Sequence, residues 1–73
     1  MNKYAVVFEA PLFEGDNWSS YVPDLPGCIG IGSTLEECRE SAMISIGMVV
    51  DDLRERGLPV PMPSASVELL AAA

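Results

Sequence analysis

The stretch Tyr21-Val22-Pro23-Asp24-Leu25-Pro26-Gly27-Cys28 decides the fold of this chain. Pro23 cannot donate a ladder hydrogen bond, so it ends the strand that precedes it. Pro26 presets φ for the first central position of a type II turn, and Gly27 tolerates the positive φ that the second position requires. A new strand is therefore expected to begin at Cys28.

Outward from this turn, the pattern predicts an α+β domain in the order strand, strand, strand, helix, strand. β-branched and aromatic residues bounded by turn signals indicate the strands. A hydroxyl cap at Thr34 or Ser33 and a left-handed stop at Gly57 bound the helix. The expected fold is a three-stranded antiparallel sheet with one long helix on one face and a short C-terminal strand. We expect strands at about 3–9, 18–22, 28–32 and 66–70, a helix at about 34–56 and a Pro-rich connector at 58–63, all in one domain over residues 1–73.

Helical periodicity places one apolar stripe on the predicted helix, and this stripe is expected to cover the sheet. Gly30 and Gly32 leave one face of the third strand without side chains, which fits a helix passing close above it. Cys28 and Cys38 are expected to be buried free thiols, because the chain has no histidine to complete a zinc site. The stripe consists of Leu35, Cys38, Ala42, Ile46, Val49 and Leu53.

Two apolar features exceed what one helix can cover. Ile44 and Met48 lie on the far side of the helix among acidic residues, which indicates a contact with a second subunit or with another protein. Gly47 adds to this, since glycine inside a helix is tolerated best where something approaches closely. The first strand has apolar residues on both faces, and one helix can cover only one of them, so the other face needs the hairpin loop, the tail or another chain. We expect a homodimer or a larger homo-oligomer with strand edges or the uncovered sheet face at the contact.

Charge narrows the classes of partner. Eleven Asp and Glu against four Lys and Arg give a net charge of −7, which favours a cationic partner and disfavours direct binding of nucleic acid. Neither a signal sequence nor a membrane-spanning stretch is recognisable, so a cytoplasmic protein is expected. Carboxylates such as Glu9 and Asp51 are interpreted as solvated charges. We expect no enzyme activity, no cofactor, no metal and no catalytic residue.

The turn motif and its continuation resemble the signature of the HicB-like antitoxin family, which reads tyrosine, any residue, proline, acid, leucine, proline, glycine, cysteine. The resemblance continues through residues 32–37 into the helix and on to residues 57–61. It implies a partial ribonuclease H-like fold that binds and silences a small basic ribonuclease toxin called HicA. The motif residues that are expected to have a structural role are Pro23, Pro26, Gly27, Cys28, Gly32 and Thr34.

A toxin that binds RNA through a basic surface would be blocked by an acidic domain laid over that surface. The expected partner contacts are Asp24, Glu37, Glu40, Ile44, Met48, Asp51 and Glu55. Many family members carry a second, C-terminal DNA-binding domain, and residues 1–73 are expected to contain none. The alternative is an orphan interaction module of the same fold without a toxin partner.

Overall fold

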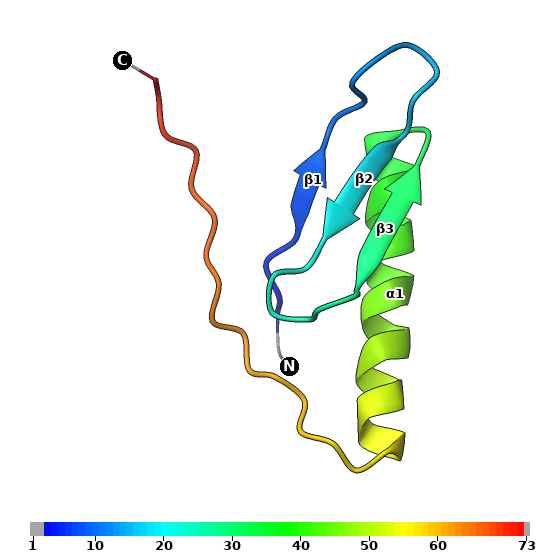
Figure 1. The fold of residues 1–73 in the computed structure, drawn as a ribbon, viewed down its shortest axis with the longest axis vertical. Coiled ribbons are helices and arrows are strands. Elements are labelled where there is room, and N and C mark those ends of the chain that lie inside the picture. Colours follow the sequence, from blue (N-terminus) through cyan, green and yellow to red (C-terminus); the bar gives the residue numbers. More distant parts are fainter. Residues whose placement is uncertain (1–2, 73) are drawn as a thin grey trace.

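The computed structural model describes residues 3–72 as a three-stranded antiparallel sheet backed by one long helix (Figure 1). The strands are β1 (Val7–Glu9), β2 (Trp18–Tyr21) and β3 (Ile29–Gly32), in the spatial order β1-β2-β3, and helix α1 spans Leu35–Glu55. The predicted α+β architecture and the order of its first four elements are confirmed.

The Pro-Gly segment between β2 and β3 forms the turn that its sequence predicts. Gly27 has a φ of 82°, and the Cys28 amide donates to the Leu25 carbonyl over 3.1 Å. The Val22 amide donates to the Cys28 carbonyl over 3.2 Å, which extends the β2–β3 pairing into the turn. Leu25 and Cys28 are each 1% exposed, so the turn is also part of the core.

Strand β1 begins at Val7 rather than at residue 3 as expected, because its partner strand β2 ends at Tyr21. Val7 lies opposite Tyr21 at the end of β2, so residues 3–6 lie beyond the last paired position. Pro23 has no N–H to offer there. The Tyr4 hydroxyl instead donates to the Pro61 carbonyl over 2.6 Å, which ties the chain start to the segment after the helix.

Helix α1 lies directly on β3, because two glycines remove the side chains between them. A Cβ atom at Gly30 would lie 2.8 Å from the Ala42 nitrogen, and one at Gly32 would lie 2.5 Å from the Cys38 nitrogen. This confirms that the bare face of the third strand brings the helix close. Because side chains alternate along a strand, Ile29 and Ile31 must point away from α1.

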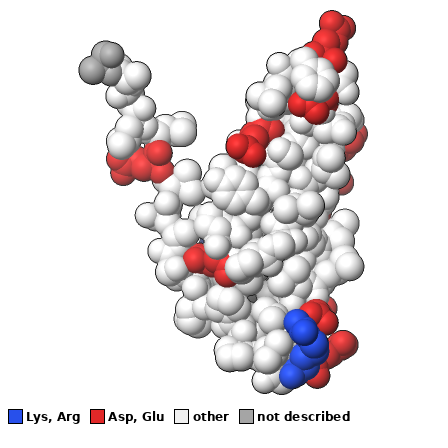
Figure 2. Space-filling model, in the orientation of Figure 1, with Lys and Arg blue, Asp and Glu red and all other residues white. Residues whose placement is uncertain are grey.

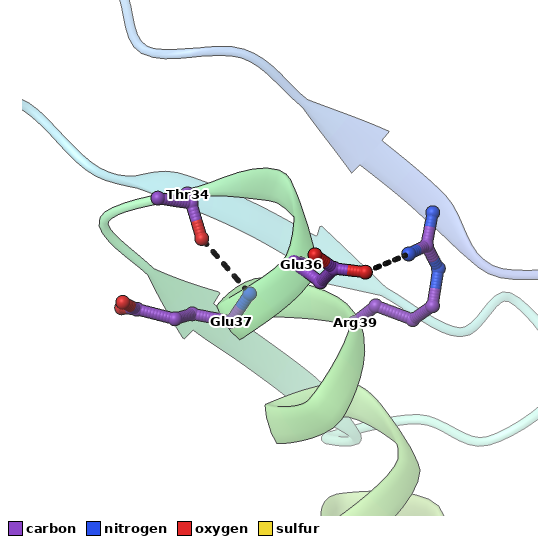
Figure 3. A network of polar contacts seen from close by, with 4 residues as sticks. All are labelled: Thr34, Glu36, Glu37 and Arg39. Carbon is purple, nitrogen blue, oxygen red and sulfur yellow. Dashed lines mark hydrogen bonds and ion pairs between the residues drawn. The ribbon is translucent and has the colours of Figure 1, made fainter.

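Both ends of α1 carry the expected caps, and Figure 3 shows the N-terminal one. The Thr34 hydroxyl accepts from the Glu37 amide over 3.1 Å, and Glu37 Oε1 accepts from the Ser33 amide over 3.1 Å and from the Ser33 hydroxyl over 2.8 Å. At the start of the same helix, Glu36 Oε1 and Arg39 Nη1 form an ion pair at 3.9 Å. Gly57 ends the helix with a φ of 68°. The predicted helix is therefore confirmed to within one residue at each end.

The core lies between the sheet, the Pro-Gly turn and the helix. Cys38 and Ala42 are the most buried residues of α1, and Cys28 and Cys38 are buried free thiols as predicted. The buried residues Val22, Leu25 and Cys28 form one cluster, and partly buried Tyr4, Val6, Ile46, Val49 and Val50 pack against it.

The short C-terminal strand expected at about 66–70 is not formed. Residues 58–72 are extended without a strand or helix, and the end of this tail runs away from the domain (Figure 1). Alternating residues make a strand possible, but a strand also needs a partner edge. Ser64 and Ala65 bind Asp24 instead, and no hydrogen bond is seen beyond Ala65 within residues 3–72. Ala73 lies outside the described residues.

Candidate partner-binding surfaces

The outer face of the sheet is an apolar surface that the helix leaves open. Strand register aligns Val7, Tyr21 and Ile29 in one row on this face, and Glu9, Ser19 and Ile31 in the next. Tyr21, Ile29 and Ile31 are 44%, 67% and 59% exposed. The sheet lies in front of α1 in Figure 1, so the same view in Figure 2 faces this surface.

The hairpin between β1 and β2 continues this surface. Leu12 and Phe13 at its tip are 90% and 68% exposed. At its base, a hollow of about 190 Å³ is lined by apolar Leu12 and Ile31 and by the carboxylates of Glu9 and Asp16. We call Val7, Leu12, Phe13, Tyr21, Ile29 and Ile31 the outer sheet surface.

Acidic residues border the outer sheet surface. Glu9, Glu14 and Asp16 lie on or beside it. On the face that Figure 2 shows, red surface of Asp and Glu lies at the hairpin end, and the blue surface of Lys and Arg lies at the opposite end. An apolar face bordered by acidic residues suits a cationic protein.

A second exposed strip follows the outer side of α1, as the sequence predicts. Ile44 and Met48 are 64% and 67% exposed, and Met43 is 66% exposed. A Cβ atom at Gly47 would meet nothing within 4 Å, so no contact inside the chain requires this glycine. The helix strip consists of Glu40, Met43, Ile44, Gly47, Met48, Asp51, Arg54 and Glu55, all exposed.

Asp24 is engaged within the chain rather than free at the surface. Its Oδ2 accepts from the amides of Ser64 and Ala65 over 3.0 and 3.1 Å, and its Oδ1 accepts from the Ser64 hydroxyl over 2.7 Å. These hydrogen bonds, led by that from the Ser64 amide, lower the pKa of Asp24 from its ordinary value. Asp24 therefore anchors the C-terminal tail to the Pro-Gly turn.

Glu37 is similarly occupied by the helix cap. The Ser33 hydroxyl and then the Ser33 amide lower the pKa of the Glu37 carboxyl by hydrogen bonding to it. Of the seven predicted contact residues, the structure brings five together on the helix strip and assigns Asp24 and Glu37 to hydrogen bonds inside the chain. The five are Glu40, Ile44, Met48, Asp51 and Glu55.

Sequence reasoning expected an uncovered sheet face from the first strand and assigned it to a contact between copies, but it did not name Ile29 and Ile31 as part of that face. The alternation of Ile29, Gly30, Ile31 and Gly32 predicts a close helix on the glycine side. The same alternation requires the two isoleucines to face away from that helix.

Two further hollows flank the C-terminal half of α1. One, of about 550 Å³, lies beside the Pro-Gly turn and is lined mainly by apolar residues such as Leu25, Met48 and Leu53. The other, of about 480 Å³, includes Gly47, Ile46 and Val50 in its lining. Within residues 3–72, His, Cys, Asp and Glu side chains nowhere gather in threes that could hold a metal ion.

Comparison with known proteins gives one match. The family model described as "HicB_like antitoxin of bacterial toxin-antitoxin system" matches residues 4–73. No curated protein and no solved structure matches the chain. In the part of the chain that the structure describes, no helix combines the length and the apolar character needed to cross a membrane.

Proposed function

The chain belongs to the HicB-like antitoxins of bacterial toxin-antitoxin systems, and on this basis we propose that it binds and neutralises a small basic ribonuclease toxin of HicA type. The antitoxin acts without catalysis of its own: it covers the surface through which the toxin binds RNA. Substrate and antitoxin then compete for the same basic surface, in the cytoplasm where the toxin meets its RNA.

The observation that carries this proposal is the acidic border of the outer sheet surface. Ile29 and Ile31 supply apolar area that can be desolvated on binding, whereas Glu9, Glu14 and Asp16 supply charge of one sign. Buried apolar anchors carry most of the affinity of an interface, and rim charges mainly raise the association rate. This combination favours a basic protein as the occupant.

The hollow at the hairpin base fits a long cationic side chain of the toxin. Its apolar walls, Leu12 and Ile31, suit the aliphatic stem of an Arg or Lys, and the carboxylates of Glu9 and Asp16 suit the charged end. One basic side chain inserted here would fix the orientation of the toxin on the sheet.

The test searches the genes next to that of this chain for one that encodes a small basic protein and uses its product as the toxin; a neighbourhood without such a gene would count against a toxin partner. We expect the chain to suppress RNA cleavage by that protein at a one-to-one ratio, and to bind it less tightly as salt concentration rises. Ile31→Asp should raise the dissociation constant at least tenfold, because it places a charge in the apolar centre.

Matched variants distinguish the surfaces. Leu70→Asp introduces the same charge at an exposed apolar position of the tail and should leave inhibition unchanged. Ile44→Asp introduces the same charge on the helix strip, which sequence reasoning assigned to a contact with the toxin or with a second subunit. Loss of inhibition with Ile44→Asp but not with Ile31→Asp would move the toxin contact to the helix. Uninhibited cleavage would remove the toxin partner and leave an orphan interaction module.

We further propose that the chain associates with itself. A 73-residue domain is near the size at which one core becomes marginal, and two separate exposed apolar surfaces remain on it. One surface can hold the toxin while the other holds a second copy.

A further inference from the structure

We propose that two copies of this chain pair through the helix strip, with their α1 helices antiparallel and crossing at Gly47. The occupant of the strip is a second copy of the chain. This inference rests on the self-association proposed above and is independent of which toxin the chain binds.

Gly47 provides the point of closest approach. It lies in the middle of α1, it is exposed, and a Cβ atom there would meet nothing within 4 Å. Glycine inside a helix destabilises the helix relative to alanine, and no neighbour within the chain requires it. A missing side chain on an open helix face allows another backbone to come close.

The charges on either side of Gly47 are arranged for an antiparallel second copy. Glu40 lies seven residues before Gly47 and Arg54 seven residues after it, so each is about 10 Å away along the helix axis and within about 20° of the direction of Gly47. A two-fold axis at Gly47 reverses the helix, which brings Glu40 of each copy opposite Arg54 of the other. The dimer therefore gains two ion pairs.

Arg54 is available for this pairing. Within residues 3–72, the ion pairs of the helix join Arg39 to Glu36 and Arg56 to Asp52. Arg54 is exposed and takes part in neither of them.

Exposed apolar residues surround the crossing point and supply area to bury. Met43, Ile44 and Met48, within four residues of Gly47, are each about two-thirds exposed. The strip carries three acids, Glu40, Asp51 and Glu55, and one cation, Arg54, so only an arrangement that sets Arg54 against an acid of the other copy suits it. The charges named on the border of the outer sheet surface, in contrast, are all acids. Two copies placed sheet to sheet would bring like charges together, so the helix strip is the better surface for self-association.

Sedimentation equilibrium over a concentration series at low salt tests the pairing. Glu40→Arg and Arg54→Glu should each raise the dimer dissociation constant at least tenfold, because each places like charges opposite one another. The double variant Glu40→Arg, Arg54→Glu should have a dimer dissociation constant within about threefold of that of the unmodified chain, since the same ion pairs form with their signs exchanged. Glu68→Arg and Lys3→Glu change the net charge by the same amounts outside the strip and should have no effect.

Gly47→Ala tests the close approach by separating stability from association. At a concentration where the chain is monomeric, its melting temperature should rise by about 4–8 °C. The dimer dissociation constant should nevertheless rise at least tenfold, because a methyl group enters the crossing point.

Three results would overturn the inference. A chain that stays monomeric at all concentrations removes self-association as a whole. A dimer that tolerates Gly47→Ala and is not rescued by the double charge exchange removes the antiparallel helix pair. A dimer broken by Ile31→Asp alone moves the interface to the sheet and leaves the proposed self-association standing.

Discussion

Replacing Gly30 by alanine should destabilise the domain, because the added methyl group overpacks the interface between β3 and α1. The new Cβ would lie 2.6 Å from Ser20 Oγ, 2.8 Å from the Ala42 nitrogen and 3.0 Å from the Ala42 Cα. Ordinary carbon contacts are about 3.5–4.0 Å. The helix must therefore move outward by roughly 0.5–1 Å.

The expected cost is in the upper part of the range for overpacking, about 2–3 kcal/mol. A domain of 73 residues has an unfolding free energy of about 4–11 kcal/mol, so this change consumes a large share of it. The melting temperature should fall by about 8–24 °C, which thermal denaturation followed by circular dichroism will measure.

A second variant separates the two neighbours of the new methyl group. Ser20 is 3% exposed and its hydroxyl has no hydrogen-bond partner within residues 3–72, so Ser20→Ala removes the closest contact at little cost. The backbone of Ala42 still blocks the site. The double variant Ser20→Ala, Gly30→Ala should therefore recover only part of the lost stability.

Gly47→Ala is the matched control, because it adds the same methyl group to the same domain where nothing lies within 4 Å. It should stabilise the monomer by about 1 kcal/mol. If Gly30→Ala melts within about 2 °C of the unmodified chain, a small fraction of the shift expected for this cost, then the helix does not lie on β3 as described and the reasoning is refuted.

Two further predictions concern the hydrogen bonds that anchor the C-terminal tail and cap the start of α1. Asp24→Asn should release the tail, so that the Ser64 and Ala65 amides exchange hydrogen at rates approaching those of unprotected amides, and proteases should cut there first; unchanged protection would contradict the anchoring role of Asp24. In the unmodified chain the folded-state pKa of Asp24 lies below its ordinary value of 3.8, so the anchor is complete above about pH 3.8 and is lost only as the pH falls through the lower, folded-state pKa. Thr34→Ala should cost about 1 kcal/mol by leaving the Glu37 amide without its cap, seen as a lower melting temperature, while Thr34→Ser should retain the cap; equal losses in both variants would show that the hydroxyl is not what matters.

The candidate surfaces were partly predictable because helical periodicity is a local property. Spacing alone places Ile44 and Met48 on the face of α1 opposite the stripe of Cys38 and Ala42, and both are exposed. What spacing could not reveal is that Asp24 and Glu37 are already hydrogen-bonded inside the chain. Ser64 is 40 residues from Asp24, and no local pattern links positions so far apart.

The sequence by itself determined the elements whose causes lie within a few residues: the Pro26-Gly27 turn, the helix from its Thr34 cap to its Gly57 stop, and the close packing that Gly30 and Gly32 permit. Only the tertiary structure decided where the rest of the chain went. Residues 3–6 and 66–70 have residues suited to strands, yet they form none in the structure, because a strand requires a neighbour with free donors and acceptors as well as suitable side chains. An open sheet face, in contrast, was expected from the apolar residues on both faces of the first strand, since one helix can lie against only one side of a sheet.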